Sequence, residues 1–242
     1  ERGHRSVAGA CRGNPFGRDA EHSPEPPFRV RASRTKIARR LTSSPDGPPY
    51  LFMRKLKHDE IERPAPSEVS RLPKHPISVV AHNVRSIYNV GSIFRTSDAA
   101  RIEHLYLTGY TGTPDHKDLH KTALGAQDTV AWSHHDEVVP ILEQHRSDGY
   151  MLAALEITDE PTPIAQVTTE QYPLCLVLGN EVQGVDDAII EQIDLAFEIP
   201  QFGAKESLNV SVAYGIAIFD LVRHFRALDG QLSAPDQSSI LS

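Results

Sequence analysis

The stretch that most constrains the fold is residues 199–223, IPQFGAKESLNVSVAYGIAIFDLVR. Its pattern predicts the end of a strand, a loop containing glycine, and a long helix that begins near Asn209. The helix is apolar on nearly all sides, which is typical of a buried helix. Its first turn nevertheless brings in Ser207, Asn209 and Ser211. Because a buried polar group without a partner costs about 1–3 kcal/mol, these side chains need partners, although Ser207 can also serve simply as an N-cap.

Short apolar runs alternate with helical patterns through the preceding part of the chain. The expected strands are residues 77–81, 104–107, 129–132, 150–155, 174–178 and 195–199. The expected helices are residues 88–100, 117–124, 137–146, 186–192 and 209–227. Strands that alternate with helices predict an α/β domain with a mostly parallel sheet.

Composition divides the chain into four parts. We expect a disordered basic extension at 1–52, a polar lead-in with a short helix at 53–75, the α/β domain at 76–228 and a flexible tail at 229–242. Residues 1–57 hold 13 Lys or Arg against 5 Asp or Glu, whereas the whole chain has a net charge of −7. A basic arm on an acidic body is typical of nucleic-acid binding, but an incidental disordered tail explains the same pattern.

Three further features of the sequence concern the start of the protein, the membrane and the cellular compartment. We hypothesise that the functional protein begins near Met53, with the upstream segment an extension or a start-site artefact. No apolar run approaches the ~20 residues of a membrane span, so we expect no membrane partner. The two cysteines, Cys11 and Cys175, form no disulfide framework, which favours a reducing, cytoplasmic setting.

Polar clusters follow three of the expected strands. In open α/β sheets ligands bind beyond the carboxyl ends of the strands. The first cluster, residues 82–95, contains Asn83, Asn89 and Arg95. The second, residues 178–184, has the spacing G-x-x-x-x-G but lacks the Lys-Ser/Thr of a nucleoside triphosphate loop. The third is the polar entry to the long helix.

Arg95 stands out because it lies on an otherwise apolar helix. We expect it to be partly buried and directed at a partner, for which Glu181 is a candidate. A purely structural ion pair with a carboxylate is the alternative to a functional role.

Taken together and in this order, the clusters resemble the motifs of the SpoU (TrmH-like) family of the SPOUT superfamily of RNA methyltransferases. The resemblance covers about residues 76–227. The matching residues are Asn83, Asn89, Gly91 and Arg95 for the first motif, Leu178, Gly179, Asn180, Glu181 and Gly184 for the second, and Ile199, Pro200 and 207–213 for the third.

The resemblance implies an α/β sheet with a C-terminal trefoil knot, a fold that composition could not indicate. It also implies a homodimer whose active site is completed across the interface. The methyl donor is S-adenosylmethionine, and the usual acceptor is a ribose 2′-OH in tRNA or rRNA. The residues implied to bind the methyl donor are Leu178, Gly179, Asn180, Gly184, Ile199, Pro200 and Leu208.

The resemblance also implies roles for the polar residues. The implied catalytic residues are Arg95, Asn89, Glu181, Ser207 and Asn209. A guanidinium group is a poor base, so a phosphate-anchoring or oxyanion-stabilising role suits Arg95 better. The candidates for RNA contact are Asn83, Arg85, Lys117 and Lys121. No metal is expected. Base methylation, or a catalytically idle RNA-binding module, remain the alternatives.

Overall fold

The structure is a computed structural model that describes residues 54–57, 65–69 and 71–230. The chain divides into two units, Glu1–Glu62 and Arg63–Ser242. The described part of the first unit, residues 54–57, forms no helix or strand. The expected extension at 1–52 and nearly all of the expected tail lie outside the described residues. A four-residue helix, α1 (Pro66–Val69), lies in the lead-in segment.

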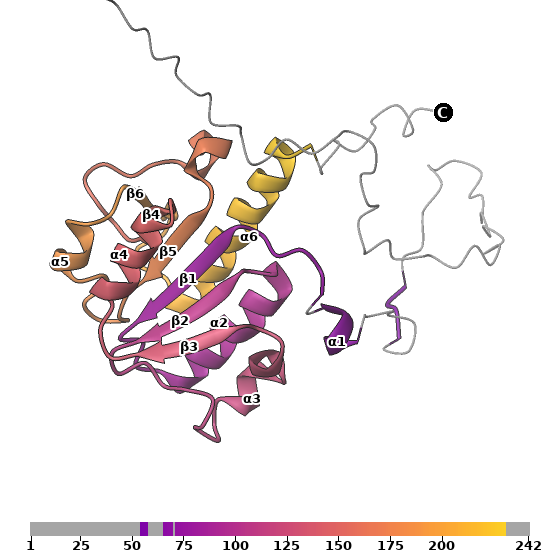
Figure 1. Cartoon of the computed structure of the whole chain (residues 1–242). Coiled ribbons are helices and arrows are strands. Elements are labelled where there is room, and N and C mark those ends of the chain that lie inside the picture. Colours follow the sequence, from indigo (N-terminus) through magenta and orange to yellow (C-terminus); the bar gives the residue numbers. More distant parts are fainter. Residues whose placement is uncertain (1–53, 58–64, 70, 231–242) are drawn as a thin grey trace, which may run out of the picture. The chain divides into compact units, whose positions relative to one another are not determined.

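A six-stranded parallel sheet forms the centre of the second unit, in the order β3-β2-β1-β5-β4-β6 (Figure 1). The strands are β1 (Ile77–His82), β2 (His104–Thr108), β3 (Trp132–His135), β4 (Met151–Leu155), β5 (Leu174–Leu178) and β6 (Leu195–Phe197). β1 and β5 are buried along their whole length, as expected for central strands covered on both faces. The predicted α/β class with a parallel sheet is confirmed.

Helices cover both faces of this sheet. The α-helices are α2 (Ile87–Ala100), α3 (His120–Ala123), α4 (Val139–Ser147), α5 (Asp187–Ile190) and α6 (Val210–Leu228). Short 3₁₀ helices lie at Ala126–Asp128, Ile164–Gln166 and Thr169–Gln171. α2 and α6 share one hydrophobic core with the sheet, whereas α4 and α5 contribute to a second core on the opposite face.

Two close contacts fix α2 among its neighbours. Gly91 lets α3 approach, because a Cβ there would lie 2.0 Å from Thr122 Oγ1 and 2.7 Å from the Leu119 carbonyl oxygen. On the side of α6, the hydroxyls of Ser97 and Tyr214 are 2.8 Å apart, and both residues are fully buried. These contacts hold the helix that carries Asn89 and Arg95 in one position.

Several predicted boundaries were wrong. The strand expected at 129–132 lies at 132–135, because Thr129 instead caps a 3₁₀ turn and its hydroxyl donates to Asp98 Oδ1 at 2.6 Å. The expected helices at 117–124 and 186–192 shrink to four residues each, and the expected strand at 195–199 ends at Phe197. Local apolar patterns do not show where a strand stops pairing with its neighbours or where tertiary contacts end a helix.

The expectation that the last helix is buried on all sides was also wrong. Val212, Ile216 and Phe219 are 51%, 46% and 47% exposed, and their spacing places them on one face of α6. The opposite face, which includes Tyr214, is buried against the sheet and α2. No helix in the described part of the chain is both long and apolar enough to cross a membrane.

Candidate functional site

Three loops at the carboxyl ends of neighbouring strands surround a cavity of about 270 Å³. The loops follow β4, β5 and β6, and the first turns of α6 complete the wall. The lining residues are Leu155–Ile157, Leu178–Gly184, Phe197–Ile199, Gln201, Glu206–Leu208, Val210 and Ala213. This is the edge of the sheet at which the sequence predicts ligand binding.

Glu181 connects the loop after β5 to the start of α2. Its Oε2 accepts a hydrogen bond from the backbone N–H of Arg85 at 2.9 Å. Its Oε1 accepts one from the N–H of Ser86 at 3.0 Å and one from Asn89 Nδ2 at 2.8 Å. Partial burial acts to raise the pKa of Glu181, but these hydrogen bonds outweigh it and hold the pKa below its ordinary value. The carboxylate is therefore a fixed anion.

The chain of hydrogen bonds continues from Asn89 to the start of α6. Asn209 Nδ2 donates to Asn89 Oδ1 at 3.0 Å. Asn209 is also the N-cap of α6, where its Oδ1 accepts from the N–H of Ser211 at 3.0 Å and from the Ser211 hydroxyl at 2.7 Å. Residues from all three polar clusters of the sequence thus meet in one network, Glu181–Asn89–Asn209.

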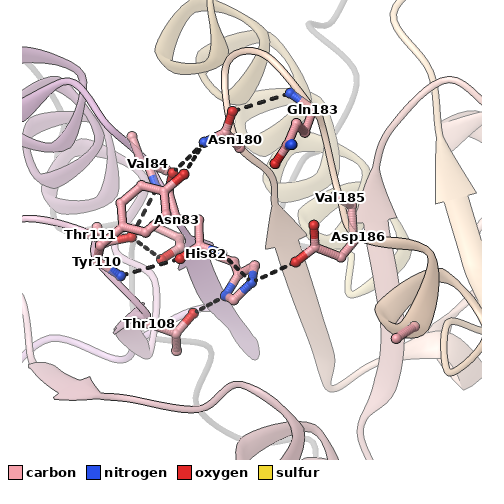
Figure 2. Close-up of polar contacts among 12 residues, drawn as sticks. His82, Asn83, Val84, Thr108, Tyr110, Thr111, Asn180, Gln183, Val185 and Asp186 are labelled. Carbon is pink, nitrogen blue, oxygen red and sulfur yellow. Dashed lines mark hydrogen bonds and ion pairs between the residues drawn. The ribbon is translucent and has the colours of Figure 1, made fainter.

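Asn180 organises the loop after β5, as Figure 2 shows. Its Oδ1 accepts from the N–H groups of Val182 and Gln183 at 2.7 and 3.2 Å. Its Nδ2 donates to the carbonyl oxygen of Asn83 at 2.9 Å and to the hydroxyl of Tyr110. The side chain therefore fixes the loop from within, so any contact of this residue with a ligand falls to its backbone.

His82 forms a second polar link between the same loops (Figure 2). The imidazole is buried, with Nδ1 2.8 Å from Thr108 Oγ1 and Nε2 3.1 Å from Asp186 Oδ2. Asn83 Nδ2 lies 2.8 Å from the same Nε2. This contact connects the carboxyl ends of β1 and β2 to the start of α5. No local pattern distinguishes His82 in the sequence, although it directly precedes Asn83.

Glu156 is a further cavity residue that sequence reasoning missed. Its Oε2 accepts from the N–H of Val185 at 2.8 Å, and its Oε1 accepts from the N–H of Ile157 at 2.9 Å. A Cβ on Gly184, which has φ +72°, would lie 2.2 Å from Glu156 Oε2, so glycine is required there. A carboxylate directly after an expected strand was the available signal.

Arg95 differs from its expectation. The residue is exposed, and its guanidinium has neither a hydrogen bond nor an ion pair within the described part of the chain. Glu181 is not its partner, because that carboxylate already accepts from the N–H groups of Arg85 and Ser86 and from Asn89. The apolar residues around Arg95 in sequence point to the other side of α2, so its own position faces outward.

The other predicted residues are distributed as follows. The cavity wall contains Leu178, Gly179, Asn180, Gly184, Ile199, Ser207 and Leu208, whereas Pro200 is not among the lining residues. Ser207 is exposed and is not the N-cap of α6, a position that Asn209 takes. Arg85 and Lys117 are exposed, and Lys121 pairs with Asp118 at 2.6 Å. Asn83 uses its side chain within the protein.

The cavity wall is acidic. Four glutamates line it, Glu156, Glu181, Glu198 and Glu206, and no lysine or arginine is among the lining residues. Such a wall favours a ligand that carries positive charge. Across the described residues, no group of three or more His, Cys, Asp or Glu side chains is placed to hold a metal ion.

Comparison with known proteins gives consistent matches. Residues 76–219 match the model of the SpoU rRNA Methylase family. The chain is 32% identical over 171 residues to a tRNA (guanosine(18)-2′-O)-methyltransferase of Aquifex aeolicus, covering 71% of this chain and 80% of that protein. It is 30% identical to the 23S rRNA (guanosine-2′-O-)-methyltransferase RlmB of Nitrosomonas europaea, covering 68% of this chain and 63% of the relative. The crystal structure of the A. aeolicus TrmH/SpoU tRNA modifying enzyme superposes with a TM-score of 0.61 at 31% identity, covering 71% of this chain and 85% of that one.

Proposed function

This chain belongs to the SpoU rRNA Methylase family, and from that premise we propose that it is an S-adenosylmethionine-dependent RNA methyltransferase acting on a ribose 2′-OH of tRNA or rRNA. The observation that carries the proposal is the Glu181–Asn89–Asn209 network beside the cavity. Relatives that match about 70% of this chain are named as 2′-O-methyltransferases of tRNA and of 23S rRNA.

The cavity suits the methyl donor. S-adenosylmethionine supplies an activated methyl group on a sulfonium, and it also carries an ammonium group. A wall with four carboxylates and no lysine or arginine complements these positive charges. The volume of about 270 Å³ is slightly below the ~300 Å³ at which the usual range for small-molecule sites begins. We assign binding to the backbone at Leu178–Gly184, which the Asn180 side chain holds in place, and to Ile199 and Leu208. Pro200, which does not line the cavity, would act by positioning its neighbour Ile199.

The protein must position the ribose hydroxyl and assist loss of its proton. In our proposal the Asn89 and Asn209 amides, held by Glu181, and the Ser207 hydroxyl orient the ribose. The guanidinium of Arg95, which is exposed and without a partner in the described structure, binds the adjacent phosphate or the developing oxyanion. Arg85 and Lys117 offer further phosphate contacts, and Lys121 offers one if it leaves Asp118. Asn83, whose side chain and backbone are hydrogen-bonded within the protein, would act by holding the loop before α2.

The test is transfer of labelled methyl from S-adenosylmethionine to total tRNA and to rRNA, followed by nuclease digestion and nucleoside mass spectrometry. We expect a 2′-O-methylated nucleoside that disappears with Arg95→Ala. A methylated base would replace the proposal with base methylation. Tight RNA binding without transfer to any RNA class would indicate an idle RNA-binding module.

We further propose that the C-terminal segment forms a trefoil knot and that the protein is a homodimer. The knot is supported by family membership and by the meeting of the loops after β4, β5 and β6 at one cavity. The dimer is supported by the exposed stripe Val212, Ile216 and Phe219 on α6. The same helix begins at Asn209, which belongs to the polar network, so we propose that a partner subunit on this face completes the active site.

The dimer proposal predicts that Ile216→Glu dissociates the protein, as measured by light scattering coupled to size-exclusion chromatography. We expect Val139→Glu, at an exposed position of α4 on the opposite face of the sheet, to keep the native mass. We also propose the domain division 1–52, 53–75, 76–228 and 229–242, and a cytoplasmic location. The buried free thiol of Cys175 supports that location.

A further inference from the structure

Tyr110 is an exposed aromatic residue next to the candidate site. It follows β2 in a tight turn and is 59% exposed, more than Tyr88 on α2. Its hydroxyl accepts a hydrogen bond from Asn180 Nδ2 (Figure 2). Asn180 directly precedes Glu181 in the chain. The ring therefore lies at the carboxyl edge of the sheet, where the three polar clusters meet.

The backbone around Tyr110 is fixed on both sides. The N–H of Gly109 donates to the carbonyl oxygen of His135 at 3.0 Å, and the N–H of Tyr110 donates to Asn83 Oδ1 at 3.2 Å. The buried hydroxyl of Thr111 donates to the Ala81 carbonyl oxygen at 2.9 Å. Gly109 has φ +63°, and a Cβ there would lie 2.0 Å from Asn83 Oδ1, so the turn is tightly packed.

An exposed ring with both its backbone and its hydroxyl held has little conformational freedom left to lose on binding. Water could satisfy the hydroxyl of an exposed tyrosine equally well, so the hydrogen bond to Asn180 chiefly fixes the orientation of the ring. Preorganised aromatic faces are effective stacking surfaces for the bases of single-stranded or looped RNA. The restraint therefore points to a flat ligand that lies against the ring.

We propose that the ring of Tyr110 is a stacking surface for a nucleobase of the bound RNA, either that of the methylated nucleotide or that of its neighbour. The inference rests on the proposed function, because a base is attached to every ribose presented to Asn89 and Asn209. Arg85 is exposed, and its side chain has no partner in the described residues. It lies two residues after Asn83, which holds the N–H of Tyr110. In this proposal Arg85 contacts the phosphate next to the stacked base. The apolar stripe on α6 is a different surface and suits a second protein subunit.

The test compares Tyr110→Ala, Tyr110→Leu and Tyr110→Phe in the full chain. Phe keeps the ring and removes only the hydrogen bond to Asn180, whereas Leu keeps apolar bulk without an aromatic face. The measurements are the KM for RNA in labelled methyl transfer to the RNA class that the wild type modifies, and the Kd for S-adenosylmethionine by calorimetry. We expect Ala and Leu to raise the KM by about tenfold or more, with Phe within about twofold of wild type. The Kd for S-adenosylmethionine should be unchanged in all three.

The outcomes separate the inference from its premise. A wild-type protein that methylates no RNA would remove both. Wild-type transfer with an unchanged KM in Tyr110→Ala would overturn only the stacking role. If Phe and Ala were equally impaired and both weakened S-adenosylmethionine binding, Tyr110 would act solely by holding the Asn180 loop. A change in oligomeric mass on Tyr110→Ala would place the ring in a protein interface and would also overturn the inference.

Discussion

Replacing Asn89 by aspartate tests the polar network most directly. Asn89 Nδ2 lies 2.8 Å from Glu181 Oε1, so Asn89→Asp places two carboxylate oxygens at about the same separation. At 2.8 Å two unit charges repel by about 1.5 kcal/mol in water and about 6 kcal/mol at an effective dielectric constant of ~20. Because Glu181 is largely exposed and Asn89 only half-buried, the lower end applies. With the lost hydrogen bond, we expect about 3 kcal/mol of destabilisation at pH 8.

The stability of Asn89→Asp should depend on pH, and the direction follows from the pKa of the carboxylate pair. Repulsion raises the pKa of the carboxylate pair in the folded protein, and the raised value belongs to the pair rather than to one residue. The folded variant therefore binds a proton that the unfolded chain does not, so its stability rises as the pH falls from 8 towards 5. In the wild type the pKa of Glu181 is lowered, so its contribution persists above the ordinary glutamate pKa and is lost only at more acidic pH.

Urea denaturation at pH 8, 7, 6 and 5 measures the free energy of unfolding of each protein. The matched control is Asn89→Leu, which removes the same amide without adding charge. We expect the deficit of Asn89→Asp relative to wild type to shrink by about 0.5 kcal/mol between pH 8 and pH 5, whereas that of Asn89→Leu stays constant. Equal and pH-independent deficits in the two variants would refute the geometry of the network.

Three further changes test the site and the packing around α2. Arg95→Lys should lose most methyl transfer while keeping the wild-type melting temperature, because lysine lacks the planar fork; retained turnover would exclude bidentate binding of phosphate. Gly91→Ala should lower the melting temperature markedly, since its Cβ would meet the backbone and side chain of α3, whereas Gly215→Ala, whose Cβ would meet nothing within 4 Å, should not. Tyr214→Phe should destabilise the protein by about 1–3 kcal/mol in urea denaturation by leaving the Ser97 hydroxyl buried and unpaired, and adding Ser97→Ala should recover part of that loss.

The exposed face of α6 shows how a sequence pattern can be read too simply. An all-apolar helix indicates that every face meets other groups, but it does not say whether those groups belong to the same chain. The described residues cover the Tyr214 face and leave Val212, Ile216 and Phe219 half exposed. The buried-helix pattern and the exposed stripe agree if a second copy of the chain covers the remaining face.

The sequence by itself determined the α/β class, the parallel sheet and the three motifs that identify the family. These features follow from local signals. The periodicity of a strand or helix, and the residues that directly follow a strand, can be recognised within a short stretch of sequence. The strands 77–81 and 174–178 and the helices 88–100 and 209–227 were predicted to within one residue at their ends. Long, regular apolar segments leave little choice of structure.

Only the tertiary structure decided which of those motif residues bind one another. Glu181 was matched to Arg95 from their chemistry, yet the fold gives its carboxylate to Asn89 and two backbone N–H groups and leaves Arg95 in solvent. The same holds for the contact of Glu156 with Val185 and for the fixed ring of Tyr110. These contacts join residues from 29 to 96 positions apart. Their geometry therefore depends on sheet order and loop packing, which no local pattern encodes.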